Sequence, residues 1–232
     1  MRKLWLLLPA LAGIVTAAPG LTGRQVLDRL RGITFARDRK ATAVMIITDR
    51  NNRVQSRKMR MVMKGDSKMM MTFEAPADLR GVTFMTTSAD NMWIYLPAQG
   101  RVRRISGSVA EQGFGGSDFS YKEMANISFA DETEVERMTE VKTQGLPAYL
   151  LDLVGKAGDQ SRLWVEKERL LPLQLEKLGS DGKPTKRVLF SEFQNQDSSW
   201  IPALIRMQDL SRGSTTELKL DKLELNLSLI HI

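Results

Sequence analysis

The side chains that enzymes use most often for catalysis are scarce in this chain. Its single histidine, His231, is the next-to-last residue, and cysteine is absent. A Ser–His pair, a thiol nucleophile and a metal site built on cysteine or histidine are therefore not expected. Asp118 and Glu123 could pair as carboxylates, but nothing in the sequence marks either as perturbed. We predict no metal, no cofactor and no enzymatic activity, and keep an envelope hydrolase as an alternative.

The glycine-rich stretch 113–117 superficially resembles a phosphate-binding loop. It lacks the lysine that such a loop needs, and no β-α-β pattern surrounds it. The run Ser117-Asp118-Phe119-Ser120-Tyr121 favours the start of a short helix, because Ser and Asp often cap helix N-termini. We interpret the stretch as a flexible hinge that carries an aromatic lid over an apolar surface. The predicted hinge and lid residues are Gly113, Gly115, Gly116, Phe119 and Tyr121.

Methionines are concentrated in the first half of the chain, where seven of the 13 lie between positions 45 and 71. Methionine is flexible and polarizable, so a surface rich in it accepts apolar ligands of varied shape. A concave sheet lined by such residues could hold acyl chains; alternatively, they simply pack beneath helices as core residues. The predicted cavity-lining residues are Met45, Met61, Met63, Met71, Phe73, Trp93, Tyr95 and Leu151.

Two aromatic pairs could form a latch for the lid. Trp93 and Tyr95 share one side of a predicted strand, and they would meet Phe119 and Tyr121 if the hinge closed. Aromatic pairs add about 0.5–1.5 kcal/mol beyond their burial, which suits a contact that must open. The alternative is that Trp93 and Tyr95 are ordinary core residues of the strand.

Three arginines, Arg101, Arg103 and Arg104, follow on the next predicted strand. They could bind lipid headgroups, or they could hydrogen-bond carbonyl groups of the lid and hold it shut. The third interpretation is a solvated sheet edge, where charge discourages aggregation. Of the three, the solvated edge is the interpretation that the sequence favours.

Short runs of alternating apolar and polar residues recur along the chain and predict β-strands. We count about eleven strands and two helical segments, which predicts a mainly β (α+β) protein. Its single large antiparallel sheet would be an open, incomplete barrel with helices on one side. Thr22 is expected to cap the first helix and Gly32 to end it. Between Thr215 and Leu225 the leucines change parity at Asp221-Lys222, which predicts a bulge or bend.

Residues 1–17 have the features of a secretory signal peptide. Arg2 and Lys3 precede an apolar run, Leu4 to Val15, which ends in small residues. The run is short for a membrane-spanning helix, so a transmembrane anchor is the weaker interpretation. We predict export to the periplasm of a soluble domain, residues 18–227. Residues 228–232 do not continue the strand pattern, and we treat them as a doubtful tail.

Basic residues outnumber acidic ones, with 34 Lys and Arg against 27 Asp and Glu. The excess is concentrated in residues 24–64, where 12 basic residues face three aspartates. This is either a solvated surface or a basic face that meets anionic headgroups or an acidic partner. Because export is expected, nucleic acid is not a predicted partner.

Two sequence motifs resemble a known family. The runs WIYLPAQGRVRRI (93–105) and GSDFSYKEM (116–124) are similar to the outer-membrane lipoprotein-sorting protein family, relatives of the periplasmic carrier LolA. The resemblance extends from about Gln25 to Leu227 and implies an open β-barrel whose concave face is covered by helices. Lys122-Glu123-Met124 departs from the acidic–acidic–leucine step of the family motif, which leaves an acidic role at Lys122 in doubt.

The resemblance implies a carrier that binds acyl chains of lipoproteins or other lipids and moves them toward the outer membrane. Its partners would be an inner-membrane donor complex or exporter and an outer-membrane acceptor, and we expect a monomer. The alternative is a non-transporting LolA-like sensor or adaptor, accessory to a membrane lipid exporter.

Overall fold

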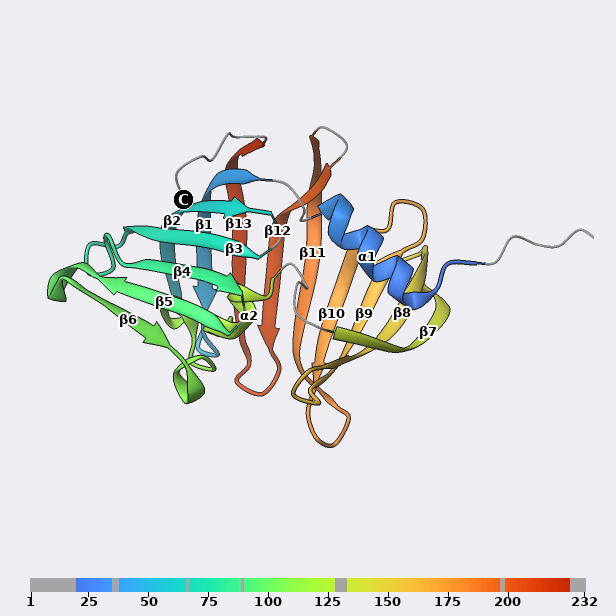
Figure 1. Cartoon of the computed structure of the whole chain (residues 1–232). Coiled ribbons are helices and arrows are strands. Elements are labelled where there is room, and N and C mark those ends of the chain that lie inside the picture. Colours follow the sequence, from blue (N-terminus) through green and yellow to red (C-terminus); the bar gives the residue numbers. More distant parts are fainter. Residues whose placement is uncertain are drawn as a thin grey trace, which may run out of the picture.

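The computed structural model describes residues 20–34, 38–65, 67–88, 90–127, 133–196 and 199–225. Strands dominate these residues (Figure 1). The strands are β1 (Arg39–Thr48), β2 (Val54–Lys64), β3 (Lys68–Ala75), β4 (Thr83–Ser88), β5 (Asn91–Leu96), β6 (Arg101–Ile105), β7 (Thr133–Thr143), β8 (Leu146–Gly155), β9 (Gln160–Glu166), β10 (Pro172–Leu178), β11 (Pro184–Gln196), β12 (Ser199–Asp209) and β13 (Ser214–Leu225). The α-helices are α1 (Gly23–Thr34) and α2 (Tyr121–Ala125).

All thirteen strands form one sheet, in the order β6-β5-β4-β3-β2-β1-β13-β12-β11-β10-β9-β8-β7. The chain enters at the centre with β1, moves outward to the edge strand β6, and resumes at the opposite edge with β7. It then returns strand by strand until β13 pairs with β1. The prediction of one large antiparallel sheet that is not closed into a barrel is confirmed. The number of strands is thirteen rather than about eleven, because even the short segments pair separately.

Side chains alternate between the two faces of the sheet, as the sequence predicts. Along β1 every second residue from Arg39 to Ile47 is buried. The predicted bulge in β13 is also confirmed: Lys222 lies opposite Thr42 and Leu220 opposite Ala43, so Asp221 has no counterpart in β1. The bulge changes which β13 side chains point inward.

Helix α1 covers the concave face of one half of the sheet, in contact with β12 and β7 (Figure 1). Thr22 caps it as predicted, because its hydroxyl accepts a hydrogen bond from the Gln25 amide at 3.3 Å. Val26, Leu27 and Leu30 form the buried stripe. The helix runs past Gly32 and ends at Thr34, so the predicted end was two residues early.

The other half of the sheet is covered by residues 106–127, which we call the crossing segment because they follow one edge strand and precede the other. Its helix α2 contacts β4. The N-cap of α2 is Ser120, which lies within the run 117–121 where the helix start was predicted. The Ser120 hydroxyl accepts from the Glu123 amide, and the Glu123 carboxylate accepts from the Ser120 amide. Both helices therefore lie on the concave side.

Some predictions lie outside the described residues. These are the signal peptide (1–17), the doubtful tail (228–232) and His231. No helix within the described ranges is long and apolar enough to cross a membrane.

Candidate functional site

A narrow apolar pocket lies on the concave side, at the centre of the sheet. Its cavity volume is about 40 Å³, and the empty space among its lining atoms, including space open to solvent, is about 480 Å³. The lining comes from β1, β2, β12 and β13, together with the end of the crossing segment. Its residues are Arg39, Ala41, Met61, Met63, Ile127, Ile201, Pro202, Ile205, Leu218, Leu220 and Leu223.

The bulge at Asp221 builds one wall of this pocket. In a regular strand, residues 220 and 223 would point to opposite faces, since side chains alternate with a period of two. The extra residue resets the alternation, so that Leu220 and Leu223 both line the pocket. The change of leucine parity in the sequence is thus a feature of the site.

Arg39 is the one charged residue of the lining. Its side chain is 5% exposed, and its guanidinium donates to the Met63 sulfur at 3.0 Å and to the Thr34 carbonyl oxygen at 3.0 Å. Burial lowers the pKa of Arg39 to about 10, so the group stays a cation at neutral pH. The pocket therefore combines an apolar lining with one buried positive charge.

The pocket lies where the two covers of the sheet meet. Arg39 bonds to Thr34, the last residue of α1, while Ile127 belongs to the crossing segment.

Aromatic rings attach the crossing segment to the sheet. Phe114 stacks on Phe73 with ring centroids 5.2 Å apart, and Phe84 meets Phe114 edge-on at 5.5 Å. Tyr121 contacts both Phe84 and Phe114 at 5.6 Å, and burial raises the pKa of its hydroxyl. Tyr121 thus packs against aromatic rings of the sheet, but its partners are Phe84 and Phe114 rather than Trp93 and Tyr95.

The glycines of the crossing segment sit in a tight, closed turn. Gly113 pairs with Ser120, and the Phe114 amide donates to the Phe119 carbonyl oxygen at 2.7 Å. Gly115 has φ of 58°, and a Cβ there would lie 2.8 Å from the Phe73 ring. Gly116 also has positive φ, 81°. These glycines permit close packing, so we correct their assignment as a loose hinge.

Asp118 anchors the crossing segment to β13 through buried hydrogen bonds. Its carboxylate accepts from the hydroxyls of Ser214 and Thr216, and from the Arg212 guanidinium at 3.1 Å. The Asp118 amide also donates to the Thr216 hydroxyl oxygen at 3.0 Å. Because Asp118 is only 3% exposed, these partners replace the water that its charge would otherwise need.

A second cation reinforces the same region. The Lys186 ammonium on β11 donates to the Glu123 carboxylate at 2.7 Å and to the Asp118 carbonyl oxygen at 2.9 Å. Arg57 on β2 donates to the Gly115 carbonyl oxygen at 3.3 Å. Strands from both halves of the sheet therefore hold the crossing segment.

The residues predicted to line a cavity divide into three groups. Met61 and Met63 line the pocket. Met45, Met71, Phe73 and Leu151 are fully packed in the core, and Phe119 of the predicted lid is buried with them. Trp93 and Tyr95 require a correction: Met92 and Ile94 face the core, so the alternation of β5 puts Trp93 and Tyr95 on the outer face.

The predicted latch arginines also require a correction. Arg103 donates to Gln99 at 2.8 Å and Arg104 to Asn91 at 3.3 Å, both within the β5–β6 hairpin region. Arg101 is exposed on the same edge strand. The cations that contact the crossing segment are instead Arg57, Lys186 and Arg212.

Arg39 and Asp118 are central residues of this region that were not predicted as such from the sequence. Arg39 has a local signal, because it shares the parity of Ala41, Ala43 and Met45 on the buried side of a strand. The partners of Asp118 have none, since Thr216 lies 98 residues away. Among the described residues, no group of three or more His, Asp or Glu side chains could hold a metal ion.

Residues 65–230 match the model of a protein family described as "Uncharacterized protein". The chain belongs to this family. No curated protein matches the sequence significantly. The fold of this family member has well-matched relatives among solved structures.

A DUF1329 family protein from Desulfovibrio piger ATCC 29098 is 25% identical, with a TM-score of 0.77 over 88% of this chain and 92% of that chain. A domain assigned to outer membrane lipoprotein-sorting proteins, from Vibrio parahaemolyticus, is 24% identical, with a TM-score of 0.76 over 89% and 91%. A LolA superfamily protein from Nitrosomonas europaea is 17% identical, with a TM-score of 0.77 over 90% and 95%. The fold is LolA-like, and the resemblance seen in the two sequence motifs is confirmed.

Proposed function

We propose that the protein is a non-enzymatic periplasmic carrier of acyl chains. It binds the chains of lipoproteins or of other lipids in the pocket between α1 and the crossing segment, and moves them toward the outer membrane. The observation that carries the proposal is the lining of the pocket, in which ten of eleven residues are apolar. The LolA-like fold and its lipoprotein-sorting relatives support the same function.

The lining suits cargo of varied shape. Met61 and Met63 can change rotamer at low cost, so the pocket can adapt to chains of different length or branching. Arg39 would meet an acidic or phosphate group at the polar end of such a cargo. An inner-membrane donor or exporter and an outer-membrane acceptor are the partners this function requires, and the carrier acts as a monomer.

Loading would open the junction at its two ends. Residues 113–121 of the crossing segment are held by the aromatic rings and by Asp118, so they stay on the sheet. The end that carries Ile127 and the end of α1 at Thr34 move apart to admit the chain. The lid is therefore the last part of the crossing segment rather than its glycine turn.

One observation favours a second function, that of a sensor or adaptor without cargo. Much of the concave face is filled by packed side chains such as Met45, Met71 and Leu151. A protein that only needs to present its surface to a partner has no use for a larger cavity. This alternative is the outcome if no lipid is found.

The first test is native mass spectrometry of protein purified gently from the periplasm, followed by lipid extraction and by uptake of a fluorescent fatty-acyl probe. Leu223→Trp fills the pocket and should weaken probe binding at least tenfold. Lys222→Trp is the matched control. Lys222 is next to Leu223 in the sequence, but its side chain points to the outer face, so this variant should bind the probe like the wild type. An empty protein that takes up no probe contradicts the carrier function, as does equal binding by the two variants.

A further inference from the structure

The half-sheet β1–β6 has an apolar row on its outer face as well as on its inner face. The inner row, covered by the crossing segment, runs across four strands through Met61, Met71, Phe84 and Ile94. Each residue of the outer row is the sequence neighbour of an inner-row residue on the same strand. It runs through Val62, Met70, Met85 and Trp93, which are directly opposite one another. The outer residues are thus aligned as regularly as core residues.

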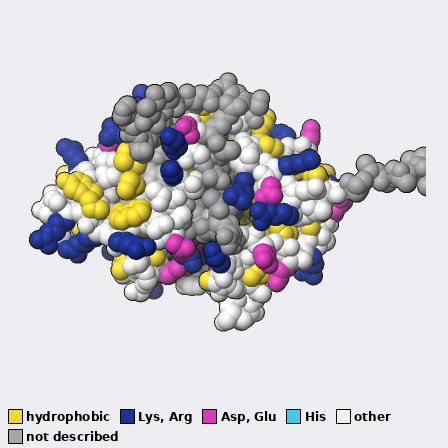
Figure 2. Space-filling view, in the orientation of Figure 1, with side chains coloured by type: hydrophobic (Ala, Val, Ile, Leu, Met, Phe, Trp, Pro, Cys, Tyr) yellow, Lys and Arg dark blue, Asp and Glu magenta, His cyan; other side chains and the backbone are white. Residues whose placement is uncertain are grey.

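This outer row is more exposed than the inner row, in which only Ile94 is partly exposed. Met85 of the outer row is 38% exposed; beside the row on the same face, Tyr95 is 40% exposed, and Val102, opposite Tyr95 on the edge strand β6, is 63% exposed. Among the described residues seven large hydrophobic side chains are exposed, and these are three of them. Figure 2 shows hydrophobic side chains over β3–β6 with basic ones around them. An aligned apolar surface of this kind marks an interaction site.

Basic residues frame the outer row. Lys40 lies opposite Val62 at one end, and Arg104 lies opposite Trp93 at the other. The described strand residues that share the outer face of β1–β6 include six cations and one acid. The cations are Lys40, Lys58, Arg60, Lys64, Lys68 and Arg104, and the acid is Glu74. Four of the 12 basic residues at positions 24–64 lie on this face: Lys40, Lys58, Arg60 and Lys64.

We propose that this outer face docks the protein on a lipid bilayer that contains anionic lipids. Tryptophan and tyrosine are favoured at the boundary between headgroups and acyl chains, because each has an apolar ring and a polar tip. Lysine and arginine around them are attracted to anionic headgroups. Trp93 and Tyr95, with the surrounding cations, provide both features on one curved surface.

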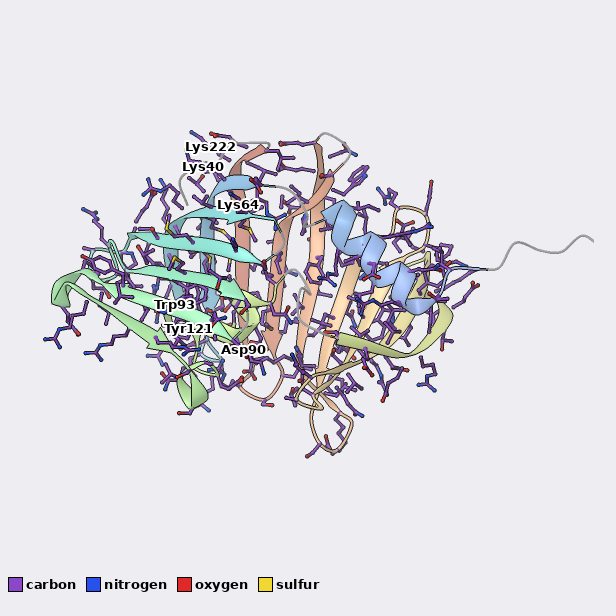
Figure 3. The ribbon with its side chains drawn as sticks, in the orientation of Figure 1. Lys40, Lys64, Asp90, Trp93, Tyr121 and Lys222 are labelled. Atoms are coloured by element: carbon purple, nitrogen blue, oxygen red, sulfur yellow. The ribbon has the colours of Figure 1, made fainter. Side chains whose placement is uncertain are left out.

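The docking surface is distinct from the pocket but borders it through the sheet. Lys40, Lys64 and Lys222 lie at the same end of β1, β2 and β13 (Figure 3). Each is the sequence neighbour of a residue that lines the pocket on the inner face: Arg39, Met63 and Leu223, respectively. Docking therefore brings this end of the pocket close to the membrane, whether or not a cargo is bound.

The experiment is cosedimentation of the purified protein with vesicles of phosphatidylcholine alone or mixed with phosphatidylglycerol, at low and high sodium chloride. We expect binding only to the phosphatidylglycerol vesicles, and weaker binding in high salt. Lys40→Glu with Lys68→Glu should weaken binding by roughly 25-fold or more, since each lysine contributes about fivefold. Lys142→Glu with Lys183→Glu changes the net charge equally, away from this face, and should bind like the wild type.

The apolar contribution is tested separately. Tyr95→Ser with Val102→Ser should weaken vesicle binding roughly tenfold, while Leu146→Ser with Leu210→Ser, at similarly exposed positions of β8 and the β12–β13 turn, should not. Urea unfolding checks that each variant is folded. Absence of vesicle binding, or equal effects of outer-face and control variants, overturns the proposal. The proposal is also overturned if sedimentation velocity shows a wild-type dimer and monomeric outer-face variants, while neither the wild type nor the variants bind vesicles. None of these outcomes depends on whether the pocket binds an acyl probe.

Discussion

Helix α1 and the crossing segment cover two halves of the same concave sheet, but different interactions hold them there. Helix α1 contributes a stripe of aliphatic side chains, Val26, Leu27 and Leu30, and one buried hydrogen bond, from Arg39 to its last residue. The crossing segment adds to its aromatic rings a buried carboxylate, Asp118, with directed hydrogen bonds to β13. Aliphatic packing is non-directional, whereas buried hydrogen bonds fix one position.

The two kinds of contact allow different motions. Helix α1 is held by its apolar stripe and by one hydrogen bond at its end, so most of its buried area is kept if it shifts along the stripe. A segment held by Asp118 loses its partners as soon as it moves. The pocket lies at the junction of the two, with adjustable packing on the side of α1 and a fixed anchor on the side of β13.

The largest effect is expected at the apolar stripe of α1. Leu27 is 1% exposed, so Leu27→Ala removes buried contacts and leaves a cavity; the free energy of unfolding should fall by about 3 kcal/mol. Urea unfolding measures it. Leu146→Ala, at an exposed position, should change the same quantity by less than about 0.5 kcal/mol. Equal losses at the two positions would mean that α1 is not packed as described.

Substitutions of Asp118 and of its hydrogen-bond partners should show energetic coupling as well as a loss of stability. Asp118→Ala leaves the hydroxyls of Ser214 and Thr216 without their hydrogen-bond acceptor, and it should lower the free energy of unfolding by about 2–3 kcal/mol. In a double-mutant cycle with Thr216→Val the two changes should be non-additive by about 1 kcal/mol. Additive effects would show that the hydrogen bonds do not position the segment.

The glycine turn offers a matched pair of positions. Gly115 and Gly100 have nearly the same φ, 58° and 59°, but a Cβ at Gly115 meets Phe73 and one at Gly100 meets no atom within 4 Å. Alanine at either position should cost about 1 kcal/mol of backbone strain, and Gly115→Ala about 1 kcal/mol more for the contact. Thermal unfolding of both variants gives the difference, and equal losses would mean that the turn is loosely packed.

The smallest effect is expected in how the free energy of unfolding changes at acidic pH. Burial alone would raise the pKa of Asp209, but hydrogen bonds from the backbone and side chain of Arg212, and from Ser211, lower it. A carboxylate whose folded pKa is depressed stabilises the protein above its unfolded pKa of about 3.9, and this is lost as pH falls through the folded value. Urea unfolding from pH 6 to pH 3 should show a shallower decline for Asp209→Asn; an unchanged slope would contradict this.

Local patterns in the sequence determined most of the secondary structure. The alternation of side chains locates the strands, the parity change at Asp221 locates the bulge, and Thr22 marks the start of α1. These features depend on residues a few positions apart, so they can be read without the fold. The sheet being open and LolA-like also followed, through the two family motifs.

Which face of a strand points inward depends on the tertiary structure and cannot be assigned from the strand's own sequence. Along β5 both parities are apolar, so the sequence allows Trp93 to face either side of the sheet. In the structure Phe114 packs on the side of Met92 and Ile94, which makes that side the inner one. The cations that hold the crossing segment and the residues that line the pocket come from strands far apart in the chain. Alternation gives each side chain a relative side, but burial is assigned by the segment that covers the sheet, and that choice is made by long-range contacts.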